Sequence, residues 1–182
     1  MNHSNSTTRT PLAAILLPAA CCLILVGCGT FPWNRDKKGI DDLAYIVTLH
    51  ELADKSVDEG NLVMPLYGSQ DGKPIWVRRI PLLTSATVAA EASAQAENKT
   101  AALNLQLNPH GQYLWMQLQA QYAGRPVAVA VDGQYRFFWY IPRPTQGKRA
   151  AAITIDGPWR LEEVQRIAEY ATDNYLILQE PK

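Results

Sequence analysis

Hydrophobic and polar positions alternate most clearly in the second half of the chain. From Thr100 to Leu107 three leucines alternate with polar or small residues, which is the period of a strand with one buried face. Asn108 and Pro109 follow, a residue that caps helix N-termini and a proline suited to the first helical position. A helix is therefore expected to run to about Ala123. Its apolar stripe comprises Leu114, Trp115, Leu118 and Tyr122.

Three more strands are predicted after Gly124, which is expected to end that helix. Pro126–Asp132 has apolar residues on both faces, which is typical of a central strand covered by helices. Asp132-Gly133 then predicts a turn into Tyr135–Ile141, which is expected to be an aromatic strand or arm. A further strand, Arg149–Ile155, is expected to end at Asp156-Gly157.

A second helix and a closing strand complete this half. The core face of the helix is marked by Leu161, Val164, Ile167, Ala168 and Ala171, and Tyr175–Leu178 is expected to be a strand. The order is then strand, helix, three strands, helix and strand, as in the split βαβ of ferredoxin-like folds. We therefore predict a single α+β sandwich, with an antiparallel-rich sheet and two main helices on one face.

The region before Thr100 is expected to be richer in strands. Leu43–His50 is composed of strand formers and predicts a first strand. Leu62–Tyr67 and Ile75–Leu83 predict two further strands around an Asp71-Gly72 turn. Thr87–Ala96 is compatible with a helix, because of its Ala, Glu and Gln residues, and also with a strand.

The first thirty residues have the pattern of a secretory signal. Met1–Thr10 is polar, Leu12–Val26 is uncharged and apolar, and small residues follow. An uncleaved transmembrane anchor is the alternative. A membrane-spanning helix needs about 20 apolar residues, whereas this run is shorter and contains Pro18.

The apolar run closes on Leu25-Val-Gly-Cys28, which resembles the lipobox of bacterial lipoproteins. That resemblance implies signal cleavage between Gly27 and Cys28 and acylation of Cys28, so that lipid holds the protein on a membrane. Gly29, in place of an aspartate after the cysteine, implies the outer membrane, with the protein facing the periplasm.

These segments divide the chain into a signal peptide (1–27), a lipidated cysteine with a short tether (28–40) and one domain (41–182). Cleavage would leave 155 of the 182 residues, enough for a self-sufficient core. Cys21 and Cys22 leave with the signal and Cys28 is acylated, so no thiol or disulfide remains. Without Arg9 the chain has 16 basic and 17 acidic residues, and this balance gives no sign of the basic face that nucleic-acid binding needs.

No enzyme motif occurs in the sequence: a nucleophile elbow, a zinc helix, a phosphate loop and a dinucleotide fingerprint are all missing. His50 and His110 lie in different predicted elements, without the four ligands that a structural zinc site needs. Asp41-Asp42 would point to opposite faces of an extended chain. Asp132 suits a turn, as does Asn98-Lys-Thr100, which matches a glycosylation sequon. We therefore expect a non-catalytic protein without cofactor or metal.

The run Phe137–Tyr140 is the best candidate for a functional surface. In a strand, Phe137 and Trp139 face one side, and Phe138 and Tyr140 face the other. One pair enters the core, and the other is either covered by a neighbouring element or exposed to a partner. Burial of both pairs is favoured, because most large aromatic residues belong to cores. Exposure would instead create a place where an extended peptide pairs with the strand.

Several glycine-anchored motifs resemble the head of the first periplasmic domain of SecD, an accessory subunit of the bacterial Sec translocase. They are the run Gly124-Arg-Pro-Val-Ala-Val-Ala-Val-Asp-Gly133, then Gly147, Ile153, Gly157, Leu161-Glu-Glu163 and Ile167-Ala168, with Ile80-Pro-Leu-Leu-Thr84 and Leu107-Asn-Pro-His-Gly111 upstream. The similarity covers roughly Ile75–Leu178. It implies the α+β fold above and binding of unfolded or exported polypeptide.

The chain departs from that family in three respects. Phe137–Tyr140 stands where the family has a small Ser-Ala-Pro segment. Arg160 replaces the Ser or Thr expected to cap the next helix, which leaves Glu163 without its capping-box partner. No segment matches the multi-helix membrane part that couples SecD to proton flow. We therefore expect binding to envelope or exported proteins without a translocation motor. An envelope enzyme with an unrecognised site and a purely structural lipoprotein are the alternatives.

Overall fold

Three β-sheets organise the part of the chain that the computed structural model describes, which is residues 40–54, 56, 60–97, 100–144 and 150–179. The leader, Gly27, Cys28 and the tether before residue 40 lie outside this part, so their roles stay predictions. The strand order of the largest sheet is β4 (Leu83–Thr84), β1 (Val47–Glu51), β7 (Pro126–Val131) and β8 (Gln134–Tyr140).

The other two sheets are a three-stranded sheet and a hairpin. The first has the order β5 (Ala89–Glu97), β6 (Thr100–Leu107) and β9 (Ala152–Trp159), and the hairpin joins β2 (Val63–Leu66) to β3 (Ile75–Arg78). The helical elements are a 3-10 turn η2 (Ile40–Asp42), a single turn α2 (Ser85–Val88), α3 (Pro109–Tyr122) and α4 (Leu161–Gln179).

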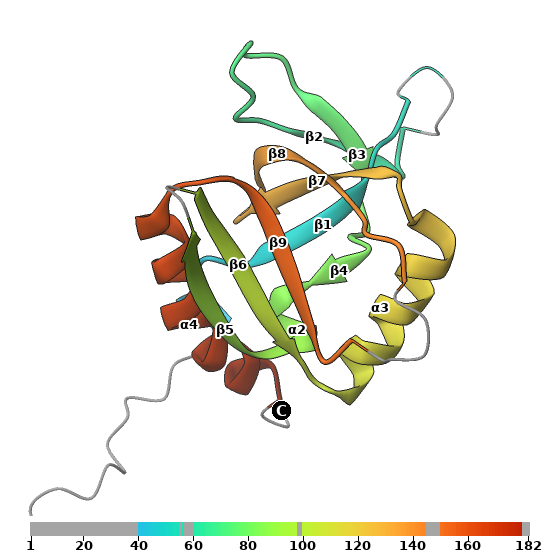
Figure 1. Cartoon of the computed structure of the whole chain (residues 1–182). Coiled ribbons are helices and arrows are strands. Elements are labelled where there is room, and N and C mark those ends of the chain that lie inside the picture. The colour runs from blue at the N-terminus through green and yellow to red at the C-terminus, as the bar shows by residue number, and fades with distance from the viewer. Residues whose placement is uncertain (1–39, 55, 57–59, 98–99, 145–149, 180–182) are drawn as a thin grey trace, which may run out of the picture. The chain divides into compact units, whose positions relative to one another are not determined.

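The main hydrophobic core lies between the four-stranded and the three-stranded sheets. Its fully buried side chains come from both sheets, among them Leu49, Val129, Leu103 and Ile155. Figure 1 shows α4 along one side of this core, next to β5, and α3 along the other. The predicted α+β class with antiparallel pairing is confirmed. The strands form separate sheets rather than one, because β1 takes the place beside β7, while β6 pairs with β5 and β9.

The strand and helix around Asn108 follow their sequence signals closely. β6 has the predicted bounds, and its leucines are buried. The Oδ1 atom of Asn108 accepts a hydrogen bond of 2.7 Å from the backbone N–H of Gly111, which caps α3 as predicted. Gly124 follows the end of α3 with a φ of +76°, a conformation that glycine adopts without strain.

β7 is central in its sheet, as predicted, and is buried from Val127 to Val131. Its two faces are covered differently. Val127 and Val129 belong to the main core, whereas Ala128 and Ala130 pack against the β2–β3 hairpin with Leu66. The expectation that helices cover this strand is therefore wrong for the face of Ala128 and Ala130, which the hairpin covers. Small alanine side chains let a hairpin lie close to this face.

The region before Thr100 contains the predicted strands in shorter form. β1 begins only at Val47, because the chain before it turns: Tyr45 has a φ of +56°, and the backbone N–H groups of Tyr45 and Ile46 donate to the carboxylate of Asp132. The ambiguous segment Thr87–Ala96 combines both alternatives. It ends the helical turn α2 and continues as β5.

The predicted end of β9 at Asp156-Gly157 is wrong, because the strand continues to Trp159. Gly157 lies within the strand and allows close packing, rather than forming a turn. A Cβ atom at this position would lie 2.5 Å from the buried ring of Phe137, so only glycine lets the ring approach the strand.

The predicted closing strand Tyr175–Leu178 is also wrong, because these residues belong to α4. Buried residues recur at helical spacing along α4, at Val164, Ile167, Ala171 and Asn174. In the sequence no glycine or proline follows before Pro181. The helix therefore continues through residues with high strand propensity, since packing overrides local preference.

β8 carries a β-bulge at Arg136. Val129 pairs with Phe137 and Ala130 pairs with Tyr135, which leaves Arg136 without an opposite residue on β7. The extra residue changes which side chains face the core. Tyr135 faces the hairpin side of the sheet, and Phe137 faces the main core.

Candidate functional site

The aromatic residues of β8 divide between the core and the surface. Phe137 and Trp139 are 8% and 5% exposed, whereas Phe138 and Tyr140 are 44% and 64% exposed. The predicted alternation of the two pairs is therefore present, but the favoured burial of both pairs is wrong. Phe137 and Trp139 are core residues, and only Phe138 and Tyr140 are placed to contact a partner.

The buried pair fixes β8 against β9 and α3. The indole N–H of Trp139 donates to Oδ1 of Asp156 over 2.7 Å, and its ring stacks on Trp115 with centroids 5.9 Å apart. Phe137 meets Trp159 edge-on, with centroids 4.8 Å apart. The exposed side chains thus belong to a strand that is anchored on its other face.

The outer edge of β8 has backbone groups that no described residue pairs. β8 is the last strand of its sheet. The N–H of Tyr135 donates outward to the carbonyl of Tyr67, and the N–H of Ile141 donates inward to the carbonyl of Arg125. Because backbone groups alternate along an antiparallel strand, Phe138 and Tyr140 direct theirs outward. The N–H of Phe138 donates to the side chain of Tyr135. The carbonyl of Phe138 and both backbone groups of Tyr140 have no hydrogen-bond partner among the described residues.

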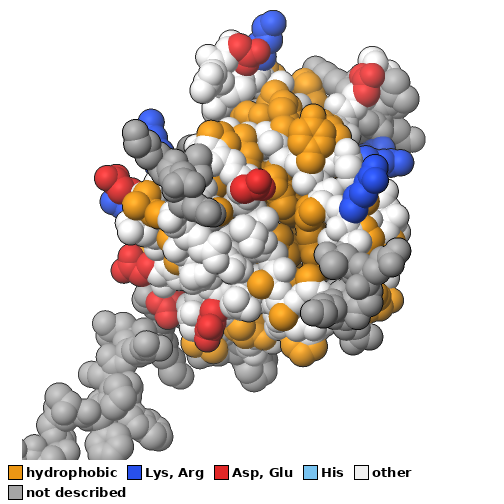
Figure 2. Space-filling view, in the orientation of Figure 1, with side chains coloured by type: hydrophobic (Ala, Val, Ile, Leu, Met, Phe, Trp, Pro, Cys, Tyr) orange, Lys and Arg blue, Asp and Glu red, His pale blue; other side chains and the backbone are white. Residues whose placement is uncertain are grey.

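An exposed aromatic patch accompanies this edge, and we define it by Tyr67, Phe138 and Tyr140. Tyr67, at the end of β2, is 64% exposed. The ring centroids of Tyr135 and Phe138 lie 5.2 Å apart, so Phe138 packs against the ring of Tyr135. Figure 2 shows hydrophobic side chains gathered over the upper part of this face, where Figure 1 places β8 and the β2–β3 hairpin.

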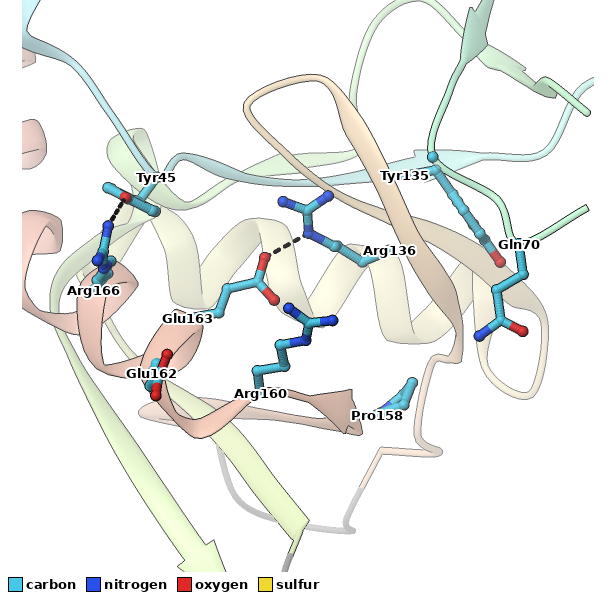
Figure 3. Close-up of a pocket in the computed structure, with 10 residues that line it drawn as sticks. Tyr45, Gln70, Tyr135, Arg136, Pro158, Arg160, Glu162, Glu163 and Arg166 are labelled. Carbon is cyan, nitrogen blue, oxygen red and sulfur yellow. Dashed lines mark hydrogen bonds and ion pairs between the residues drawn. The ribbon is translucent and has the colours of Figure 1, made fainter. Parts of the chain in front are cut away.

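A cavity of about 530 Å³ adjoins the first residues of β8. Three arginines from three separate elements line it, namely Arg136 in the β8 bulge, Arg160 after β9 and Arg166 in α4. Figure 3 shows the guanidinium groups of Arg136 and Arg160 on either side of the Glu163 carboxylate. The remaining lining comes from Tyr45, Gly68, Gln70, Tyr135, Pro158 and Glu162. We call this the arginine pocket.

Two of the three arginines are held in place by neighbours. The Nε atom of Arg136 bonds the carboxylate of Glu163. An Arg166 nitrogen donates over 2.8 Å to the hydroxyl of Tyr45, and this bond raises the pKa of Arg166 further above its ordinary value. Arg160 stands before α4 where a capping Ser or Thr is usual, so Glu163 binds an arginine instead of a cap.

Sequence reasoning did not single out Arg136 or Arg166 as site residues. They lie 30 positions apart in different elements, and no short motif joins them. The departure at Arg160 from the usual helix cap was the one available signal.

Tyr135 separates the pocket from the aromatic patch. Burial and then the negative charge of Asp71 raise the pKa of Tyr135, while the bond from the Phe138 backbone lowers it in part. Its hydroxyl therefore stays protonated at neutral pH.

The other polar residues considered in the sequence lie apart from these sites. Asp132 occupies a turn, with a φ of +49°, and bonds the chain before β1. Asp41 and Asp42 lie in η2, and His110 is exposed at the start of α3. Asn98 lies outside the described residues. Within the residues placed by the structure, His, Cys, Asp and Glu do not form a group of three suited to a metal ion.

His50 joins β1 to β3 and is only 3% exposed. Its Nδ1 lies 2.9 Å from the carbonyl oxygen of Arg78, and its Nε2 lies 3.0 Å from the hydroxyl of Thr48. A carbonyl only accepts, so Nδ1 donates and neutral Nε2 accepts from the hydroxyl. Burial lowers the pKa of His50, although the bond to Arg78 opposes this.

The stability of the fold is expected to fall as the pH drops below about 6.5, the ordinary pKa of histidine. The unfolded chain binds a proton there before buried His50 does, so acid favours unfolding. Urea unfolding at pH 7.5 and 5.5 checks this, with His50→Gln expected to lose less stability than the wild type. His110→Gln is the control. An equal loss in wild type and His50→Gln would contradict the assignment.

No protein-family model matches this chain, and no curated protein is significantly similar to it. Within the described residues, none of the helices has both the length and the apolar character of a membrane span.

Four solved chains are similar to this chain, and the three described here are structures of SecDF. SecDF in the super-membrane-facing form has a TM-score of 0.48 and 15% identity, over 70% of this chain and 18% of that one. A SecDF structure described as a membrane component that enhances protein export has a TM-score of 0.48 and 15% identity, over 71% and 62%. SecDF from Thermus thermophilus, described as translocon-associated, has a TM-score of 0.39 and 18% identity, over 74% and 20%. This chain spans less than two thirds of each.

Proposed function

We propose that this chain is a non-catalytic envelope lipoprotein whose domain binds other polypeptides along the outer edge of β8. The observation that carries the proposal is the coincidence of open backbone groups and exposed aromatic side chains at Phe138 and Tyr140. Monomeric proteins usually protect such edges with charge or a covering element. An aromatic edge that the described residues leave unprotected is therefore best explained by a partner.

The edge suits an extended polypeptide that adds one strand to the sheet. The carbonyl of Phe138 and the N–H and carbonyl of Tyr140 would pair with its backbone, which gives affinity without a particular sequence. Phe138 and Tyr140 would cover its apolar side chains. A weak preference for sequence suits a protein that handles many partners.

The membrane anchor and the link to protein export rest on the sequence. In this proposal Cys28 carries the lipid and holds the domain at the outer membrane, facing the periplasm. The resemblance of the Gly124–Gly133 motif to the SecD head favours exported or envelope proteins as the partners. No cofactor and no metal take part.

Photo-crosslinking in living cells tests the polypeptide partner. A benzophenone amino acid at Tyr140 is expected to give discrete crosslinked products, and the same group at Tyr113 should give few. Tyr113 is a fair control because it is 54% exposed, on α3. Substituting Phe138 with Asp should reduce the Tyr140 products at least about fivefold, since a charge at the edge disfavours strand addition.

Equal crosslinking from Tyr140 and Tyr113, or products unchanged by Phe138→Asp, would overturn this assignment. Mass spectrometry of the N-terminal fragment of the wild-type protein should find an acylated Cys28 as the first residue. An intact leader, or an unmodified Cys28, would argue against the lipid anchor while leaving the β8 edge in place.

A further inference from the structure

The arginine pocket carries more positive charge than its own carboxylates neutralise. It brings together Arg136, Arg160 and Arg166 with two carboxylates, those of Glu162 and Glu163. Glu163 is taken by Arg136, and Arg166 is bound to Tyr45. The side chain of Arg160 makes no hydrogen bond or ion pair with any residue that the structure places. One guanidinium therefore faces the cavity with its donors unused.

We propose that this pocket binds a single carboxylate of the polypeptide that pairs with β8, either its C-terminal group or an acidic side chain. The inference rests on the proposed function and adds a chemical preference to it. A guanidinium offers two parallel N–H donors, which match the two oxygens of a carboxylate. Arg160 would supply them, and Arg136, already oriented by Glu163, would add positive charge from the other side.

The position of the pocket relative to the open edge supports one ligand for both. Tyr135 and Arg136 line the cavity, and Tyr140 lies four residues farther along the same strand. At about 3.3 Å per residue this is roughly 13 Å, the length of a four-residue extended segment. A strand that runs antiparallel to β8 would pair from Tyr140 to Phe138, leave the edge where Tyr67 bonds the N–H of Tyr135, and bring its C-terminal end toward the pocket.

The charge balance of the pocket selects a carboxylate over a phosphate group. Three guanidinium groups and two carboxylates leave one net positive charge. A phosphate group with nearly two negative charges would meet repulsion from Glu162 and Glu163. One carboxylate instead neutralises the excess. The neutral hydroxyl of Tyr135 and the amide of Gln70 provide further donors at the rim.

Fluorescence anisotropy with three synthetic probes tests the inference on the purified full-length protein. The probes are a labelled Thr-Val-Thr-Val-Thr-Val peptide with a free C-terminal carboxylate, the same peptide as its amide, and an amide peptide with Glu as its last residue. At least one acidic probe is expected to bind about fivefold more tightly than the neutral amide, the range of an exposed ion pair. Added salt should narrow the difference.

Variants connect the preference to the pocket. Arg160→Gln is expected to remove the advantage of the acidic probe, while Arg79→Gln, an exposed arginine after β3, should leave it unchanged. The free acid and the Glu amide show which kind of carboxylate binds. Equal binding of all three probes, weakened for all by Tyr140→Ser, would overturn the carboxylate site and leave the peptide edge standing. Failure of every probe to bind the wild type would overturn both.

Discussion

Gly111→Ala is expected to lower the free energy of unfolding by about 1–3 kcal/mol, the range for overpacking a tight contact. Local propensity predicts the opposite sign, because alanine favours a helix over glycine by about 1 kcal/mol. Packing decides the result here. A Cβ atom on Gly111 would lie 2.6 Å from the carbonyl oxygen of Val88 and 2.8 Å from its Cβ. Urea unfolding followed by circular dichroism measures the difference.

Val88, which a Cβ atom on Gly111 would meet, cannot shift without disturbing the contact between α2 and α3. The same Val88 carbonyl accepts a hydrogen bond of 2.8 Å from the backbone N–H of Asn108, the residue that caps α3. Pushing α3 away from α2 would weaken both the cap and this bond. Gln117→Ala, on the exposed face of α3, is the control and should change stability by less than about 0.5 kcal/mol. A Gly111→Ala protein as stable as the wild type would refute the close contact.

Trp139→Ala is expected to cost about 3–5 kcal/mol, as for other buried large aromatic residues. This is a large part of the 5–15 kcal/mol that stabilises a typical domain. The change removes the stack on Trp115 and leaves the carboxylate of Asp156 without its indole donor. Thermal and urea unfolding measure the loss.

The neighbouring residue provides the matched control for Trp139. Tyr140→Ala removes an aromatic ring that is 64% exposed, so it should cost less than about 1 kcal/mol. Trp139→Phe keeps much of the packing and loses the bond to Asp156, and its stability should fall between the two. Equal costs for Trp139→Ala and Tyr140→Ala would mean that the two faces of β8 are assigned wrongly.

The elements that sequence predicts well are those decided by adjacent residues. The alternation of β6, the cap at Asn108 and the proline at the start of α3 lie within ten consecutive positions. Neighbouring residues are therefore enough to predict this strand and the start of this helix. The opposite orientation of Phe137 and Phe138 follows from strand geometry alone. These local features predict which side chains share a face.

What covers a face depends on residues far away in the sequence. The β2–β3 hairpin covers Ala128, Ala130 and Tyr135 but leaves Phe138 44% exposed. No pattern within β8 contains that information, which is why burial of both aromatic pairs was expected. The length of α4 has the same origin. Tyr175–Leu178 favours a strand locally, and only the buried stripe that reaches Asn174 shows that the helix continues.

The arginine pocket could not be predicted from the sequence for a different reason. Its charged residues come from the bulge of β8, the end of β9 and the first turns of α4. Charges that are scattered along a chain with balanced composition give no local excess. These charged residues form a site only because the fold brings the β8 bulge, the end of β9 and the start of α4 together.

The unpaired residue at position 136 sets the phase of the strand that follows it. If Arg136 instead took an ordinary place opposite Val129, the rest of β8 would shift by one position, which would turn Phe137 and Trp139 toward solvent and Phe138 and Tyr140 inward. Removing Arg136 while keeping the Asp132-Gly133 turn would leave each aromatic residue opposite its present partner on β7, because the bulge already absorbs the extra residue. Homologues that lack one residue at this point should therefore keep the same buried and exposed faces, whatever their aromatic residues are.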